Sequence, residues 1–382
     1  MAKKQITVYI GRFNPFHVGH AAVLSQAVAT SDHTIVLVGS AFQAPSTKNP
    51  FSYVQRATMI DRFLKDTGVQ RVSEITSIRP VRDYPYSDNS WIQAVQQTVS
   101  DVIAGLGPDF SDAKISLTGS DRDDSTWYLR SFPQWGLKLQ PAFNLPNDAD
   151  ISATSVRKVL FESDLSDEAF STLSAKVPHS TLIFLREQAS AGRLDTLRAE
   201  YAFIKKYKAA WASAPYEPVF VTADAVVVQS GHVLVVERGA LPGRGLWALP
   251  GGFVNQKERI RRAGIREAIE ETGIRLAEGK RALEITEAMM NGSIRAKEIF
   301  DDPNRSARGR TITVAYLFRL DDTKPLPKVA GQNVPAYESN GQTIVETAKA
   351  FWVPLDVALK NSEFWFEDHH AILSTMISKM DE

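Results

Sequence analysis

The segment Gly252–Ile274, GFVNQKERIRRAGIREAIEETGI, constrains this chain more than any other, because a glycine-led loop passes directly into a helical pattern. Gly273 stands where a helix C-cap is expected. Spacings of three and four residues place Glu267, Glu270 and Glu271 on one helix face. Their carboxylates repel one another there, and a hard divalent cation such as Mg2+ would offset that repulsion through oxygen ligands. An ordinary solvated helix face is the alternative.

The same segment resembles the Nudix box, in which glycine, glutamate, Arg-Glu, Glu-Glu and glycine recur at fixed spacing. Those positions are occupied here by Gly252, Glu258, Arg266, Glu267, Glu270, Glu271 and Gly273. The departure from the pattern is Ala268 at an aliphatic position, which concerns packing rather than chemistry. The resemblance implies a hydrolase of nucleoside diphosphates linked to another group, with metal-activated water.

Roles within the box also follow from the resemblance. Glu267 and Glu271 are expected to bind the metal, and Glu270 to share or support it. Backbone carbonyls near Gly252 would complete the ligand set. An ion pair between Glu258 and Arg266 is expected to brace the loop against the helix. The expected cofactor is Mg2+, with Mn2+ as the alternative ion.

Size and composition favour an intracellular protein with two domains. A chain of 382 residues exceeds what one core usually serves. Lys+Arg and Asp+Glu both number 44, so no net charge attracts nucleic acid or a membrane. Cysteine is absent, and no apolar stretch approaches the roughly 20 residues of a membrane span. We expect a cytoplasmic protein without nucleic-acid or membrane partners, and homo-oligomerisation stays open.

Strands and helices alternate in the N-terminal half. A strand at 6–11, a helix at 19–29 and a strand at 34–38 form a β-α-β unit. Alternation of this kind predicts an α/β fold, a doubly wound, Rossmann-like parallel sheet with its ligand site at the carboxyl ends of the strands. Further helices are expected behind capping boxes at Ser52/Gln55 and Ser90/Gln93, and further strands near 72–78 and 115–118.

The pattern changes in the middle of the chain. Thr154 is expected to cap a short helix, and the following helical stretches end near residue 212. Beyond them, a hairpin across 223–237, a strand at 311–320 and a last helix at 368–380 indicate an α+β sandwich. We therefore predict an N-terminal domain at 1–178, a helical connector at 179–213 and a second domain at 214–382.

The first strand is followed by GRFNPFHVGH, in which His17 and His20 flank Gly19 at a helix start. Backbone N–H groups and the helix dipole at such a turn favour phosphate, and imidazoles add donors. A surface helix turn and half of a zinc site are the alternatives. The segment resembles the HxGH signature of nucleotidyltransferases, and ISATSVR, at 151–157, resembles their ISxTxxR signature.

Together with GSDRDDSTWYLRSFPQW at 119–135, these motifs resemble the archaeal-type nicotinamide-mononucleotide (NMN) adenylyltransferases over roughly residues 5–178. That family transfers AMP from ATP to NMN and releases NAD and pyrophosphate. By this resemblance His17, His20 and Arg157 would hold the ATP phosphates, with help from Arg12. Sibling enzymes that adenylylate flavin mononucleotide or phosphopantetheine share HxGH and remain alternatives.

The resemblance assigns further contacts in the first domain. Ser152 and Thr154 would donate to phosphate oxygens, Trp91 would stack on the nicotinamide ring, and Asn89 would be its polar partner. Mg2+ would accompany ATP. Lys48, Asn49 and Arg56 could reach phosphate or ribose, or could be a solvated lysine and a structural arginine.

In the second domain, FDDPNRSARGRTITVAYLF at 300–318 resembles ADP-ribose pyrophosphatases of the Nudix superfamily. Arg308 and Arg310 would meet phosphate there, with an ordinary basic loop as the alternative. Glu346 is a candidate general base, against an exposed loop glutamate. The resemblance continues to FEDHHAIL at 366–373. The whole chain therefore resembles bifunctional proteins that join the two activities, and ADP-ribose would be the substrate of the second domain. A non-catalytic ADP-ribose sensor is the alternative for this domain.

Overall fold

The computed structural model describes residues 3–69, 71–120, 124–141, 151–278, 281–330, 336–339, 342–345 and 347–380. The chain forms two compact units, Met1–Ala202 and Phe203–Glu382. Among the described residues, no helix is both long and apolar enough to cross a membrane.

The first unit is built on a parallel sheet, which confirms the predicted doubly wound α/β fold. Over the described residues its strand order is β3-β2-β1-β4-β5, and each neighbouring pair is parallel. The chain therefore leaves the central strand β1 in one direction and returns on its other side through β4. The carboxyl end of β1 is thus the topological switch point, where folds of this kind bind their ligands. The strands are β1 (Gln5–Gly11), β2 (His33–Ala41), β3 (Thr76–Arg82), β4 (Lys114–Gly119) and β5 (Gly136–Leu139).

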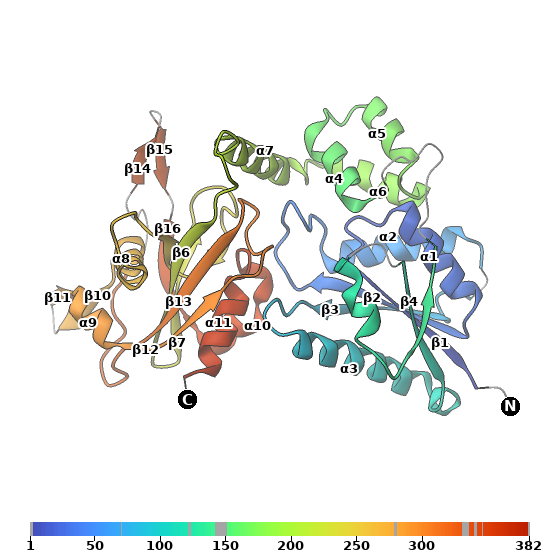
Figure 1. The fold of residues 1–382 in the computed structure, drawn as a ribbon, viewed down its shortest axis with the longest axis horizontal. Coiled ribbons are helices and arrows are strands. Elements are labelled where there is room, and N and C mark those ends of the chain that lie inside the picture. Colours follow the sequence, from blue (N-terminus) through green and yellow to red (C-terminus); the bar gives the residue numbers. More distant parts are fainter. Residues whose placement is uncertain are drawn as a thin grey trace. The chain divides into compact units, whose positions relative to one another are not determined.

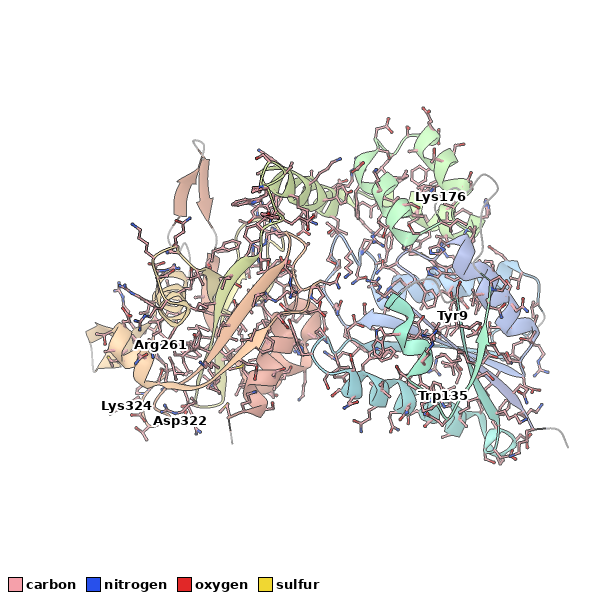
Figure 2. All side chains as sticks on the ribbon, in the orientation of Figure 1. Tyr9, Trp135, Lys176, Arg261, Asp322 and Lys324 are labelled. Carbon is pink, nitrogen blue, oxygen red and sulfur yellow. The ribbon has the colours of Figure 1, made fainter. Side chains whose placement is uncertain are left out.

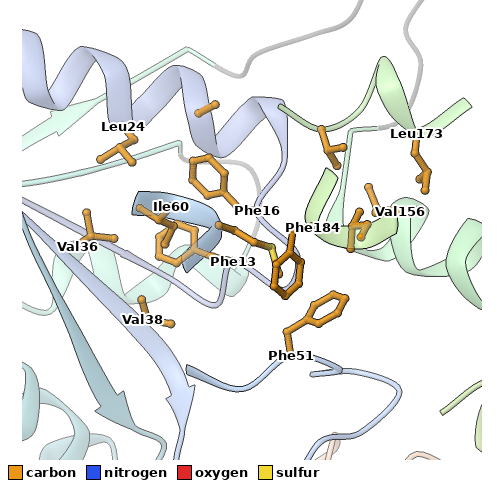
Figure 3. Packing of buried hydrophobic residues seen from close by; sticks show 14 of the residues in the cluster. Phe13, Phe16, Leu24, Val36, Val38, Phe51, Ile60, Val156, Leu173 and Phe184 are labelled. Atoms are coloured by element: carbon orange, nitrogen blue, oxygen red, sulfur yellow. The ribbon is translucent and has the colours of Figure 1, made fainter. Parts of the chain in front are cut away.

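Helices cover both faces of this sheet (Figure 1). Val8 and Ile10 of β1 pack on the side of α3, whereas Tyr9 packs on the side of α1 and α2. Figure 3 shows the latter core, in which Phe13 and Phe16 lie among residues from α1, α2 and β2. The helices are α1 (Val18–Ala29), α2 (Tyr53–Asp66), α3 (Asp88–Leu106), α4 (Ala153–Glu162) and α5 (Asp167–Ser174), with 3-10 turns η1 (Pro108–Phe110) and η2 (Asp124–Arg130).

Two predicted helix starts are wrong and one is confirmed. Ser52 and Gln55 form the predicted capping box of α2. The α3 helix begins earlier than predicted, because the Ser87 hydroxyl accepts from the N–H of Ser90. The α4 helix is capped by Ser152 rather than Thr154. In both errors a serine two or three residues upstream competes for the same first-turn N–H groups.

The first half of the predicted connector packs into the first unit. Phe184 and Leu185 of α6 (His179–Ser190) are buried in the same core cluster as Phe16. Leu194, just before α7 (Asp195–Ala209), and Leu197, in its first turn, also belong to that cluster. The compact unit accordingly extends to Ala202.

The second unit is a mixed-sheet sandwich. Its main sheet follows the order β12-β13-β6-β7-β16 in the described chain, with β8 paired to β7 and β9 paired to β6. Helix α8 lies on one side of this sheet and α11 on the other (Figure 1). Its elements are β6 (Phe220–Gln229), β7 (His232–Arg238), β8 (Trp247–Ala248), β9 (Gly251–Phe253), α8 (Ile260–Thr272), β10 (Arg275–Glu278), β11 (Arg281–Glu284), α9 (Glu287–Gly292), β12 (Ile294–Phe300), β13 (Thr311–Arg319), β14 (Ala336–Ser339), β15 (Gln342–Val345), β16 (Thr347–Pro354), α10 (Leu355–Lys360), η3 (Ser362–Phe364) and α11 (His369–Ser378).

Candidate active sites

The histidine pair caps the helix that follows the central strand of the first unit. The Nδ1 atom of His17 accepts from the N–H of His20 at 3.4 Å, and Nδ1 of His20 accepts from the N–H of His17 at 3.3 Å. Their rings stack with centroids 3.5 Å apart. Because both Nδ1 lone pairs accept hydrogen bonds, a neutral ring carries its proton on Nε2. Each imidazole can therefore donate from Nε2 at the N-terminus of α1.

Arg157 connects the second signature to the first. Its Nη1 donates to the carbonyl of Asn14 at 2.8 Å, and its Nη2 donates to Oγ1 of Thr154 at 3.0 Å. Burial, together with the nearby charge of Arg12, lowers the pKa of Arg157 to about 10. The guanidinium remains charged at neutral pH, so two cations share the carboxyl end of β1, where an anion would relieve their repulsion.

Lys176 is a nearby cation that no sequence motif indicated (labelled in Figure 2). Its Nζ lies 3.2 Å from Oγ of Ser155 in the first turn of α4, and its carbonyl accepts from the N–H of Val18 in α1. Ser152, predicted to contact phosphate, uses its hydroxyl to accept from the N–H of Ser155. The N-termini of α1 and α4 are thus tied together through one lysine.

Arg56 is a structural residue, one of the two alternatives left open by the sequence. It is 1% exposed, and its guanidinium donates to the carbonyls of Arg12, Gly39, Ser40 and Ser52. Burial lowers its pKa to about 10. These bonds join α2 to the carboxyl ends of β1 and β2.

Trp91 lies in an aromatic cluster at the N-terminal end of α3. Its ring centroid is 5.6 Å from that of Trp127 and 6.0 Å from that of Tyr128. The Tyr128 hydroxyl donates to the carbonyl of Ile10, so the cluster is anchored at the carboxyl end of β1. Burial raises the pKa of Tyr128 to about 12. Asn89 is exposed in the first turn of α3, and Trp127 is 45% exposed.

In the second unit, the predicted ion pair between loop and helix is present. Both oxygens of Glu258 accept from Arg266, at 3.1 Å from Nε and 2.8 Å from Nη2, and Nη2 also donates to the carbonyl of Phe253. These hydrogen bonds hold the pKa of Glu258 below its ordinary value. Gly273 ends α8 in the left-handed conformation, as predicted.

Two of the three clustered glutamates face the backbone of the glycine loop, residues 248–252, which includes the start of β9. The N–H of Gly251 donates to Oε2 of Glu271 at 2.9 Å, and Oγ1 of Thr347 donates to its Oε1 at 3.1 Å. The Glu267 carboxylate packs against Cα of Gly252, where a β-carbon would overlap it. Burial, together with the charge of Glu267, raises the pKa of Glu271 to about 8.

Glu270 differs from the other two, because its side chain is 56% exposed and accepts from Nη1 of Arg266 at 3.0 Å. No group of three or more His, Cys, Asp or Glu side chains among the described residues forms a metal site by itself. The donor set of Glu267, Glu271 and loop carbonyls nevertheless fits a hard divalent cation, which is commonly bound through one or two carboxylates together with substrate phosphates.

The two predicted arginines of the 300–318 segment have different surroundings. Arg310 donates from Nη1 to the carbonyl of Asp301 and so closes its own loop. The Arg308 guanidinium lies 5.5 Å from the ring centroid of Phe253, and its buried Nε has no hydrogen-bond partner among the described residues. Glu346 lies outside the described residues.

Sequence comparisons divide the chain in the same way. A cytidylyltransferase-like family model matches residues 8–159, and a NUDIX domain model matches residues 219–373. The chain is 29% identical over 186 residues to a nicotinamide/nicotinic acid mononucleotide adenylyltransferase of Acinetobacter baylyi, covering 49% of this chain and 87% of the relative. It is 29% identical over 197 residues to a nicotinamide-nucleotide adenylyltransferase of Sulfurisphaera tokodaii, covering 51% and 98%.

A solved structure matches both units together. A bifunctional NMN adenylyltransferase/ADP-ribose pyrophosphatase from Francisella tularensis is 31% identical to this chain and superposes with a TM-score of 0.82. The match covers 98% of this chain and 99% of the Francisella chain. The same Francisella protein in complex with AMP and a manganese ion gives a TM-score of 0.81. Nudix hydrolases and nucleotidyltransferases both use divalent metals.

Proposed function

The chain belongs to the family of bifunctional NMN adenylyltransferase/ADP-ribose pyrophosphatases, and from this membership we propose how its residues divide the two reactions. The first unit transfers AMP from ATP to NMN, giving NAD and pyrophosphate. The second unit hydrolyses ADP-ribose to AMP and ribose 5-phosphate. ATP as substrate supports a cytoplasmic location, which cell fractionation can test.

Adenylyl transfer needs positioning and charge stabilisation rather than a covalent intermediate. A phosphate oxygen of NMN attacks the α-phosphorus of ATP in line, and pyrophosphate leaves. The Nε2–H donors of His17 and His20 and the guanidinium of Arg157 would stabilise the developing negative charge. Arg12, Ser152 and Thr154 would hold the remaining phosphate oxygens. The reciprocal Nδ1 caps are the observation that best supports this role, because they direct both Nε2 donors away from the helix.

The aromatic cluster around Trp91 supports a flat, ring-bearing acceptor. Trp91 would stack on the nicotinamide ring, with exposed Trp127 beside it and Asn89 as the polar partner. Since the cluster is anchored to Ile10 at the end of β1, the acceptor would lie at the same sheet edge as the ATP phosphates.

In the second unit, Glu267, Glu271 and carbonyls of the Gly251–Gly252 loop would hold Mg2+ or Mn2+, with Glu270 in support. The bound cation would neutralise the diphosphate and lower the pKa of water. Arg308 would bind a diphosphate oxygen through its guanidinium, which lies over the ring of Phe253 in β9. Arg310 would support that loop.

A His17→Asn variant tests the first assignment. Asparagine Oδ1 can accept from the His20 N–H as Nδ1 does, so the helix cap is kept while the Nε2 donor is lost. We expect adenylyl transfer to fall at least about 100-fold, with the melting temperature and ADP-ribose hydrolysis unchanged. Full NAD synthesis by this variant would remove His17 from the reaction.

Assays of ATP consumption with NMN, flavin mononucleotide and phosphopantetheine identify the acceptor. Preference for either of the latter two would overturn the proposed substrate.

For the second unit, chromatography of the products formed from ADP-ribose and from NAD tests the proposed cleavage. Preferential cleavage of NAD would contradict it, and binding of ADP-ribose without turnover in the presence of Mg2+ would support the sensor alternative.

A further inference from the structure

The segment Phe366–His370, FEDHH, contributes none of the residues proposed above, yet it contacts the loop 248–252 that carries the metal-binding backbone. We propose that four residues of the second unit, Asp224, Arg305, Asp368 and His369, form a clasp that positions this loop for metal binding. The inference rests on the proposed hydrolase function of the second unit.

The centre of the clasp is a buried, two-point ion pair. The Arg305 Nε donates to Oδ2 of Asp368 at 2.9 Å, and its Nη2 donates to Oδ1 at 3.0 Å. The two side chains are 4% and 7% exposed. A bidentate pair of this kind fixes direction as well as distance. It joins the loop before β13 to the start of α11.

Asp224 links this ion pair to the glycine loop. Nη2 of Arg305 lies 3.8 Å from Oδ2 of Asp224, which also accepts from Oγ1 of Thr313 at 2.7 Å. The other oxygen, Oδ1, packs against Cα of Gly251 so closely that a β-carbon there would overlap it. The same Gly251 donates its N–H to Glu271. The Asp224 carboxylate therefore limits where Gly251 can lie, and Gly251 is the hydrogen-bond partner of the proposed metal ligand Glu271.

His369 binds the loop two residues before Gly251. Its Nδ1 accepts from the N–H of Leu249 at 3.0 Å, and the ring is buried. The carbonyls on either side are also bound, because Pro250 accepts from the N–H of Ala225 and Trp247 accepts from the N–H of Phe366. The backbone that leads into Gly251 is thus held from both the sheet and the C-terminal segment.

Stability alone gives little reason for this arrangement. Removing charges from water offsets most of their attraction, and well-packed apolar side chains commonly stabilise a core equally well. Outer-shell partners that orient metal ligands, by contrast, change metal affinity and activity when they are lost. The placement of the Asp224 carboxylate directly against Gly251 favours the second explanation.

The test uses the full chain with Asp368→Asn, His369→Leu and His369→Asn. Free Mn2+ is measured by electron paramagnetic resonance, and kcat and KM are measured for ADP-ribose. We expect Asp368→Asn and His369→Leu to weaken Mn2+ binding about 10-fold and to lower kcat about 10- to 100-fold. His369→Asn should recover most of both, because its Oδ1 can accept from Leu249. Asp356→Asn, which removes an exposed carboxylate of the same unit, is the matched control and should change neither.

The melting temperature reports the folding of the second unit in every variant, and adenylyl transfer shows that the first unit is intact. Unchanged Mn2+ affinity with only a lower melting temperature would show that the clasp merely stabilises the fold, which would overturn the proposal. Equal failure of His369→Asn and His369→Leu would do the same. If the natural chain binds Mn2+ but does not cleave ADP-ribose, the proposed function fails, while Mn2+ affinity still decides the role of the clasp.

Discussion

At the residue scale, side chains that hold similar positions in a sequence motif make different contacts in the fold. Glu270 and Glu271 are adjacent members of one motif, but only Glu271 contacts the loop backbone, whereas Glu270 is exposed and bound to Arg266. Arg308 and Arg310 differ in the same way, because Arg310 is tied to a carbonyl of its own loop. Proximity within a motif therefore does not establish equal roles.

The first prediction compares these glutamates. Glu271→Gln should lower kcat for ADP-ribose hydrolysis about 100-fold or more, equivalent to roughly 2.7 kcal/mol of transition-state stabilisation. Glu270→Gln should cost about 10-fold or less, because its carboxylate is solvated. Steady-state kinetics at saturating Mn2+ make the comparison. Equal losses would show that the exposed position of Glu270 changes when metal binds.

The second prediction concerns Arg56. Arg56→Met removes the buried donor of three carbonyls, those of Arg12, Gly39 and Ser40, and should destabilise the first unit by roughly 3 kcal/mol. Arg62→Met, on the same helix, breaks an exposed pair with Glu187 and should cost less than about 1 kcal/mol. Calorimetric melting of the two variants tests this. Equal melting temperatures would contradict the structural role assigned to Arg56.

The sequence predicted the residues that lie within motifs, because spacing on one turn or helix determines which side chains share a face. It could not predict Lys176 or Arg305, which reach their sites through tertiary packing from distant segments. Nor could it show that Arg56 binds carbonyls rather than phosphate. An arginine at a loop–helix junction has the same local signal in either role.

At the element scale, hydrogen bonds from one arginine join α8 to the loop before it. Arg266 binds Glu258 in the loop, the Phe253 carbonyl in β9, and Glu267 in its own helix. The predicted capping of α3 and α4 was wrong because neighbouring serines offer the same hydroxyl acceptor, and local sequence does not rank them. Helix existence was therefore more predictable than helix start.

The third prediction is a pH dependence at this junction. Arg266 depresses the pKa of Glu258 in the folded state, so the pair stabilises the protein above about pH 5, and that stabilisation is lost as the pH falls through the depressed pKa. Glu258→Gln should cost about 2 kcal/mol at pH 7 and progressively less in acid. Melting temperatures between pH 3 and 7 follow the difference. A difference independent of pH would exclude the ion pair as its source.

At the scale of the whole molecule, the α/β unit and the mixed-sheet unit followed from the strand and helix pattern. The domain boundary at 178/179 remains a prediction. Helical periodicity shows that 179–213 is helical but not which core receives its apolar face. Phe184 and Leu194 are buried in the core of the first unit, and this packing is visible only in the tertiary structure.

The fourth prediction concerns fragments. A fragment of residues 1–209 should fold and make NAD, because it retains α6 and α7. A fragment of residues 1–178 should be much less stable, since it exposes core otherwise covered by four buried apolar side chains, each worth about 1.5–3 kcal/mol. Circular dichroism melting and NAD synthesis compare the two. Equal stability would place the boundary at 178/179.

One measurement tests the central claim that this chain joins nucleotides at one site and splits a diphosphate at another. The natural chain, His17→Asn and Glu271→Gln are each incubated with ATP plus NMN and, separately, with ADP-ribose, and the products are quantified by chromatography. We predict that His17→Asn loses NAD formation alone and that Glu271→Gln loses AMP and ribose 5-phosphate formation alone. Loss of both activities in either variant, or neither product from the natural chain, would contradict the account.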